Sequence, residues 1–142
     1  EMTVDRVANL DLCYAPPFSQ AMDNIITAAN VARNKMSGYM QGISPHDVHT
    51  KLKNNEAFVL LDVRTNREYE EVRLPKSTLI PLGALRGRIN ELPRDMEIIA
   101  FCSVSLRAYE AALILKAAGF SQVGVMDGGI HMWPYEKIEG LL

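Results

Sequence analysis

Several features that mark specialised classes of protein are scarce in this sequence. Only two of its 142 residues are cysteine, Cys13 and Cys102, so we expect free thiols in a reducing compartment and not a disulfide framework. No apolar run approaches the roughly 18 residues that a membrane-spanning helix needs. The start of the chain has no basic segment followed by an apolar one, so it does not resemble a secretory signal. These absences predict a cytoplasmic protein.

Charge of one sign is equally scarce. The 15 Lys and Arg residues and 17 Asp and Glu residues give a formal net charge of −2, which offers no attraction to nucleic acid or to an anionic membrane. We therefore expect neither as a partner. A chain of 142 residues can build one compact core with a short appendage. Because it opens with Glu1 and not with methionine, we expect a fragment of a longer protein.

From residue 38 onward, short apolar runs alternate with helical patterns. The runs are continuous, as in strands buried on both faces of a sheet, and they occupy residues 57–61, 97–101 and 122–126. The predicted helices lie at 44–53, 83–92 and 107–118. Ser44 is the expected N-cap of the first helix, and Gly119 is expected to end the last. This alternation predicts an α/β fold with a parallel sheet, whose site lies beyond the carboxyl ends of the strands.

Residues 1–37 have a different character. A proline-broken stretch precedes a helix that we predict from about Ser19, as its N-cap, to Arg33. Apolar side chains recur at helical spacing at Met22, Ile25, Ile26, Ala29 and Ala32. We find nothing else in this segment to bury that stripe, so we expect it to pack on another domain or subunit. The sequence thus predicts two parts, 1–37 and 38–142.

Cys102 follows the predicted strand at 97–101. Four residues separate it from Arg107, where a predicted helix begins: Ser103, Val104, Ser105 and Leu106. Backbone N–H groups and a helix N-terminus at such a place favour an anion, so we expect a populated thiolate and a stabilised persulfide. The alternative reading is a buried, inert cysteine at a strand end. These residues alone leave both open.

Three stretches of the chain resemble the rhodanese family of sulfurtransferases. One is Leu60-Leu-Asp-Val-Arg64, continued by Glu68-Tyr69, Leu74-Pro75 and Ile80-Pro81; another is Gly128-Gly-Ile-His-Met-Trp133; the third is the segment 102–107, in the place of the catalytic loop. The resemblance implies a five-stranded parallel sheet with helices on both faces, preceded here by an extended segment and a helix. It also implies that Cys102 accepts a sulfane sulfur as a persulfide and passes it to a thiophilic acceptor.

The resemblance further implies supporting residues around the loop. Asp62, Arg64 and Glu68 are expected to form a structural ion-pair group beneath it. Arg107 lies at a helix end that is unfavourable for a cation, so we expect it to close the loop and contact an anionic donor, and not merely to begin a solvated helix.

Several further positions could belong to the site. Gly128 and Gly129 are expected to let the backbone turn close to the loop. Trp133 is expected to pack in the core, with a place lining the site as the alternative. His46 and His49 could share a metal, but no third ligand is evident nearby, so we predict a solvated helix face and no metal site.

The loop departs from the family's common form, in which an arginine follows the cysteine and a glycine stands at the fourth position. Ser103 and Ser105 occupy those places. Loss of the cation predicts weak use of thiosulfate, and Ser105 argues against a positive φ. Phosphatases and arsenate reductases of this fold have one residue more between the cysteine and the arginine. Because this chain has the shorter loop, we favour sulfur transfer over those two activities. A non-catalytic interaction module is a third possibility, against which the intact Cys102 argues.

The stretch 11–24 resembles the end of the dimerisation domain in FAD-dependent pyridine nucleotide-disulfide reductases of the coenzyme A-disulfide reductase type. Some of these carry a C-terminal rhodanese domain, which implies that 1–37 is a remnant of the reductase domain of the same polypeptide. Tyr14 would then lie near a coenzyme A site across the dimer interface, with simple packing as the alternative.

This second resemblance implies cofactors and partners for the whole enzyme. It would be a homodimer that uses FAD, NAD(P)H and coenzyme A to reduce persulfides, polysulfides or coenzyme A disulfides. The fragment itself is expected to hold no cofactor and to act on small sulfur donors and thiol acceptors.

Overall fold

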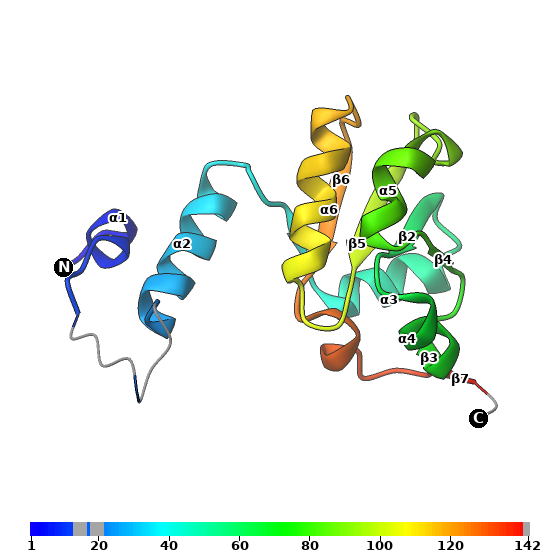
Figure 1. Cartoon of the computed structure of the whole chain (residues 1–142), viewed down its shortest axis with the longest axis horizontal. Helices are drawn as coiled ribbons and strands as arrows, with labels where there is room; N and C mark the ends of the chain where they lie inside the picture. Colours follow the sequence, from blue (N-terminus) through cyan, green and yellow to red (C-terminus); the bar gives the residue numbers. More distant parts are fainter. Residues whose placement is uncertain (13–16, 18–21, 141–142) are drawn as a thin grey trace. The chain divides into compact units, whose positions relative to one another are not determined.

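The computed structural model describes residues 1–12, 17 and 22–140 (Figure 1). The chain divides into two compact units, Glu1–Met40 and Gln41–Leu142. Within the described residues, no helix is both long enough and apolar enough to cross a membrane.

The first unit consists of two helices, α1 (Val4–Ala8) and α2 (Asn24–Met36). The N-cap of the second helix is Asp23, four residues later than we predicted, because its carboxylate accepts a hydrogen bond from the Ile25 amide at 2.8 Å. Ser19, the predicted cap, lies outside the described residues.

The apolar stripe of α2 finds part of its cover inside the first unit, which corrects our expectation that the segment offers none. Helix α1 packs against α2. An ion pair of 3.1 Å between Asp5 and Arg33 also joins the two helices. Ala29 is buried, whereas Ile25 remains 57% exposed. Ile26 and Ala32 are half-buried, so the N-terminal end of the stripe, Met22 and Ile25, is the part that is still open to solvent.

The second unit is built on a five-stranded, fully parallel sheet. Its strands are β1 (Gly42–Ile43), β2 (Phe58–Asp62), β4 (Ser77–Leu79), β5 (Glu97–Phe101) and β6 (Val123–Met126), in the spatial order β1-β6-β5-β2-β4. The central strand is thus β5, so the residue that follows its carboxyl end has other strand ends on both sides.

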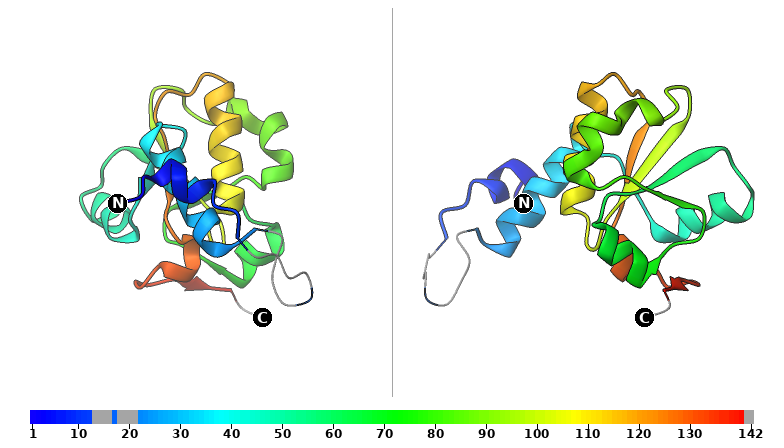
Figure 2. Two further views of the ribbon diagram at one scale, coloured as in Figure 1. Left: turned by 90° about the vertical axis from the view of Figure 1, so that its left-hand side faces the viewer. Right: turned by 45° about the vertical axis from the view of Figure 1, so that its right-hand side comes forward.

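Helices cover both faces of this sheet, as the fold prediction required. The helices are α3 (Pro45–Lys53), α4 (Asn66–Glu71), α5 (Leu82–Arg88) and α6 (Leu106–Ala117), with 3-10 turns at Ile89–Glu91 and Gly129–Met132. Helices α5 and α6 lie together on one face, and α3 lies on the other (Figure 2). A small antiparallel pair, β3 (Val72–Arg73) with β7 (Ile138–Glu139), completes the unit. The predicted α/β fold is confirmed.

The packing of α6 follows from its alanines. Ala108, Ala111 and Ala112 are at most 1% exposed and lie on the side of the helix that packs against β5 and β6. Small side chains let the helix axis lie close to the sheet. On the opposite face, Val48 of α3 belongs to the cluster that contains Phe101. The strand that precedes Cys102 is therefore held rigidly from both sides.

The junction between the units generates a testable prediction. We expect limited digestion with trypsin to cut near Lys35 and to leave a stable core that begins close to Gly38, because the second unit contains its own sheet and core. Fragment masses and the thermal unfolding of the purified core would measure this. A core that unfolds once cut would show that residues 1–37 are integral to it, which would overturn the predicted boundary.

Candidate active site

Cys102 lies directly after the central strand β5, and α6 begins at Leu106. The residue is 1% exposed, and its Sγ accepts a hydrogen bond from the Ser105 amide at 3.2 Å. The loop between strand and helix is therefore only four residues long, 102–105. In contrast to the buried sulfur, the side chains of Val104 and Leu106 are 57% and 75% exposed, so this segment presents two apolar side chains to solvent.

Ser105 has a backbone conformation that we did not expect. Its φ is 129° and its ψ −25°, although it has a Cβ, so our argument against a positive φ is wrong. The Ser105 hydroxyl accepts a hydrogen bond from the Gly128 amide at 2.9 Å and lies 3.4 Å from the Met126 carbonyl oxygen, to which it donates. The strained residue is thus attached to the end of β6.

Arg107 is held by a carboxylate from another part of the chain. Its Nη1 and Nη2 donate to the two carboxylate oxygens of Glu68 at 2.8 and 2.7 Å. Ser103 connects the same groups, because its hydroxyl donates to Glu68 Oε1 and accepts from Arg107 Nη2, both at 2.9 Å. This paired geometry closes one side of the cysteine loop.

The charges in this group perturb each other. The hydrogen bonds from Arg107 hold the pKa of the Glu68 carboxyl well below its ordinary value of 4.5. The pKa of the Arg107 guanidinium is raised, chiefly by Glu68 and to a smaller extent by Cys102. Both side chains therefore stay charged over the whole physiological range.

Glu68 does not belong to the ion-pair group in which we placed it. It sits in the first turn of α4, where it forms a capping box with Thr65: the Thr65 amide donates to Glu68 Oε2 at 3.0 Å, and the Thr65 hydroxyl accepts from the Glu68 amide. The cap fixes the carboxylate so that it points at the loop. The Thr65-x-x-Glu68 spacing was the signal that sequence reasoning overlooked.

Asp62 and Arg64 form a separate and fully buried pair. Asp62 is 0% and Arg64 3% exposed. The Asp62 carboxylate accepts from the Arg64 backbone amide, Nε and Nη2 at 2.7 to 3.1 Å, and Nη2 also donates to the Val72 carbonyl at 2.7 Å. Removal of one partner would leave an uncompensated buried charge, which typically costs about 3 to 5 kcal/mol. The pair stabilises the end of β2 and touches no reacting atom.

The two glycines lie where the chain passes against the loop. Gly129 has φ +57°, and a Cβ there would overlap the carbonyl oxygens of Cys102 and Ser103. Those carbonyls accept from the Ile130 amide at 2.9 Å and the His131 amide at 3.2 Å. Gly128, at φ +72°, turns the chain and supplies the amide that bonds Ser105. Two amides and one hydroxyl therefore attach the 3-10 turn to the loop.

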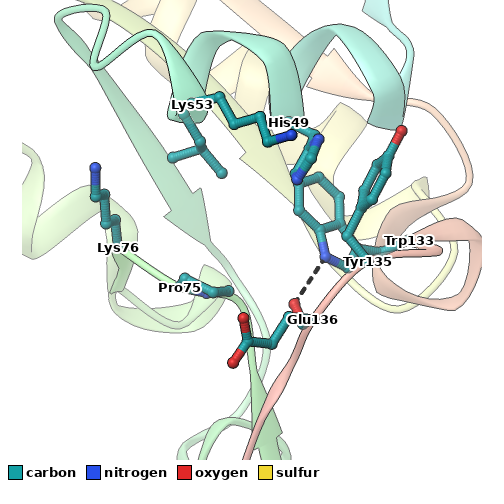
Figure 3. Close-up of a pocket in the computed structure, with 8 residues that line it drawn as sticks. His49, Lys53, Pro75, Lys76, Trp133, Tyr135 and Glu136 are labelled. Carbon is teal, nitrogen blue, oxygen red and sulfur yellow. Dashed lines mark hydrogen bonds between the residues drawn. The ribbon is translucent and has the colours of Figure 1, made fainter.

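Trp133 lies in the core of the α3 face and not in the cysteine loop. It is 3% exposed, and its Nε1 donates to the Glu136 carbonyl at 3.1 Å. Figure 3 shows it beside a pocket of about 190 Å³, whose other walls include Lys53, Pro75 and Lys76.

The two histidines of α3 only partly form the solvated face that we predicted, because His46 is exposed but His49 is half-buried. His49 stacks on Tyr135 with ring centroids 3.6 Å apart, and His46 Nδ1 lies 2.7 Å from the Tyr135 hydroxyl. In the part of the chain that the structure describes, no three His, Cys, Asp or Glu side chains gather as a metal site would require. Cys13 and Tyr14 lie outside the described residues.

Comparison with known proteins gives this geometry a family context. A family model, the Rhodanese-like domain, matches residues 44–135. A sulfurtransferase from Allochromatium vinosum is 28% identical over 91 residues, which cover 64% of this chain and 85% of that protein.

Two solved structures are similar over almost the whole chain. Reduced CoADR-RHD from Bacillus anthracis aligns with a TM-score of 0.86 at 32% identity, and an NAD-dependent persulfide reductase from A. fulgidus with a TM-score of 0.78 at 46% identity. Each alignment covers 93% of this chain and 23% of the other. This chain therefore spans less than a quarter of the length of those two proteins.

The depressed pKa of Glu68 predicts how stability depends on pH. A carboxyl whose pKa is lower in the folded state stabilises that state above its ordinary value of 4.5, and this contribution is lost as the pH falls below it. We expect Glu68→Gln to lower the free energy of unfolding by about 1 kcal/mol at neutral pH, since the pair is about one-third exposed and screened by solvent. The difference from wild type should shrink in acid.

Denaturant unfolding over a pH series would measure this difference. Glu91→Gln serves as the matched control, because it removes an exposed pair with Arg88 and should have a smaller effect. A difference for Glu68→Gln that stays constant into acid would contradict the pairing described here.

Proposed function

Because this chain belongs to the rhodanese-like domain family, whose model matches residues 44–135, we propose that its second unit is a sulfurtransferase that carries sulfane sulfur on Cys102. The observation that carries the proposal is the placement of the Cys102 sulfur. Cys102 directly follows the central strand, and its sulfur accepts a hydrogen bond from the Ser105 amide. The N-terminus of α6 lies four residues further along the chain. Backbone donors and a helix N-terminus both stabilise negative charge on sulfur.

The outer sulfur atom is transferred in two displacement steps. The Cys102 thiolate attacks the outer sulfur of a donor persulfide, the sulfur–sulfur bond of the donor breaks, and the donor departs as a thiolate. An acceptor thiolate then attacks the outer sulfur of the Cys102 persulfide, and Cys102 leaves as a thiolate. The outer sulfur keeps its oxidation level throughout, so neither step needs an oxidant or a reductant. The amide that binds the Cys102 thiolate can also bind it as the leaving group of the second step.

The electrostatics of the loop favour donors with little negative charge. Arg107, a cation that interacts with Cys102, is already bonded to the Glu68 carboxylate through both terminal nitrogens. Ser103 occupies the place where the family commonly has an arginine, and its hydroxyl is bonded to the same carboxylate. An incoming thiosulfate dianion would meet a neutralised cation and a nearby carboxylate. An organic persulfide meets no such penalty, and Val104 and Leu106 offer apolar contact to its carbon chain.

We further propose that this unit works inside a larger flavoenzyme. The two similar solved structures are a CoADR-RHD and an NAD-dependent persulfide reductase, and the likeness extends through the first unit. The full enzyme would be a cytoplasmic homodimer that uses FAD, NAD(P)H and coenzyme A to reduce persulfides, polysulfides or coenzyme A disulfides. Its flavin and nicotinamide sites would belong to a reductase domain beyond residues 1–142, with Tyr14 near the coenzyme A site.

Sulfur loading of the protein tests the central proposal. After exposure to glutathione persulfide, intact mass spectrometry should show a mass increase of one sulfur atom that cyanide removes. Cys102→Ser should abolish the increase, because the acceptor sulfur is gone, while the matched variant Cys13→Ser should load like wild type. Loading that persists in Cys102→Ser, or that never occurs in wild type, would refute the proposal and favour a non-catalytic module.

Donor choice gives a second measurement. We expect slow turnover of thiosulfate and faster turnover of glutathione persulfide. Ser103→Arg should lower the KM for thiosulfate about tenfold, since a unit charge at about 4 Å is worth about 1 kcal/mol even in water and thiosulfate carries two charges. The KM for the persulfide should change little. Rapid thiosulfate turnover by wild type, unaltered by this substitution, would refute the charge argument.

A further inference from the structure

The hydroxyl of Ser105 makes hydrogen bonds that are unusual for a residue at the N-cap of a helix. Ser105 is the N-cap of α6, a position where serine normally bonds an amide of the first helical turn. Here the side chain makes no such bond. It crosses instead to the end of β6, where it accepts from the Gly128 amide and donates to the Met126 carbonyl oxygen. The helix is left without a side-chain cap.

The same residue supplies the one backbone donor that the structure shows on the sulfur among the described residues. Its amide lies 3.2 Å from Cys102 Sγ. The direction of that amide depends on the Ser105 backbone, whose φ of 129° is strongly disfavoured for any residue with a Cβ. A residue in such a conformation relaxes unless the surroundings hold it. The only side-chain hydrogen bonds that hold this one, among those described, are the two to β6 and Gly128.

We infer that Ser105 is a positioning residue, whose hydroxyl holds its own strained backbone so that its amide stays on the sulfur of Cys102. The geometry separates the two tasks within a single residue: the side chain anchors to the neighbouring strand, and the main chain binds the reacting atom. A glycine at this place would need no anchor, because it adopts this φ without opposition. A serine needs one, and the structure provides it.

This assignment makes alanine and glycine differ at position 105. Ser105→Ala keeps the Cβ that opposes the conformation and loses both hydrogen bonds, so the loop should relax and withdraw the amide. Ser105→Gly also loses the hydrogen bonds but loses the steric opposition as well, so the amide can remain. A residue that merely stabilised the fold would be damaged at least as much by glycine as by alanine, because glycine adds chain entropy to the unfolded state.

The experiment measures the rate at which Cys102 is alkylated by iodoacetamide, followed by peptide mapping across a pH series. Ser105→Ala should be slower than wild type by about fivefold at neutral pH, and its pH profile should move to more alkaline pH, because one hydrogen bond to the charged sulfur is lost. Ser105→Gly should stay within about twofold of wild type. Ser77→Ala is the matched control, since it removes a hydroxyl that donates to the Leu74 carbonyl at 2.7 Å in another part of the unit, and it should leave the profile unchanged.

Several outcomes would overturn the inference: an Ala variant as fast as wild type, an Ala and a Gly variant that are equally slow, or a Ser77→Ala profile that shifts as much. If Ser105→Ala fails to fold, Ser105→Gly decides, and a loss of about tenfold there contradicts the positioning role.

The inference rests on the proposed function only through the importance of the sulfur, since alkylation requires no sulfur donor. Sulfur loading is therefore measured alongside. Wild type that fails to load contradicts the proposed function, whereas wild type that loads no faster than Ser105→Ala contradicts only the role of Ser105.

Discussion

The carboxylate of Glu68 binds groups from both sides of the sulfur site. One oxygen accepts from the Thr65 amide and from Arg107, and the other accepts from Ser103 and from Arg107. These contacts tie the first turn of α4, which follows β2, to the loop that follows β5. They also explain how a cation can occupy the N-terminal turn of α6: the unfavourable interaction of Arg107 with the helix dipole is offset by a bidentate partner.

The two ion pairs near the site have different physical characters. Asp62 and Arg64 are excluded from water. Each supplies the opposite charge that the other needs, because an unpaired buried charge would be strongly destabilising. Glu68 and Arg107 are each about one-third exposed, so solvent screens them and their energetic contribution is modest. The buried pair supports the strand end, while the exposed pair determines the electrostatic environment that a substrate meets.

Sequence reasoning predicted the parts of this molecule that depend on local pattern. The continuous apolar runs predicted β2, β5 and β6 to within a residue or two at each end, and Ser44 caps α3 as expected. Short elements such as β1, β4 and α4 have too few residues for a periodic signal. Their place in the fold was available only from the family resemblance, which gave five strands.

The details of the site were less accessible. Glu68 and Arg107 are 39 residues apart in sequence, and no local pattern reports that they meet. The φ of Ser105 could not be inferred from residue type, because it depends on hydrogen bonds to the end of β6. Asp23 caps α2, a role that sequence reasoning had given to another residue.

The sheet's two outer strands bear on how the molecule meets others of its kind. β1 has two residues and β4 has three, whereas the three inner strands have four or five. An outer strand exposes unpaired backbone N–H and C=O groups, and long exposed edges invite intermolecular β-pairing and aggregation. Edges this short present too few groups to template such an addition. Short edges of this kind therefore disfavour edge-to-edge pairing of two such sheets and leave the side-chain surfaces as the better place for association.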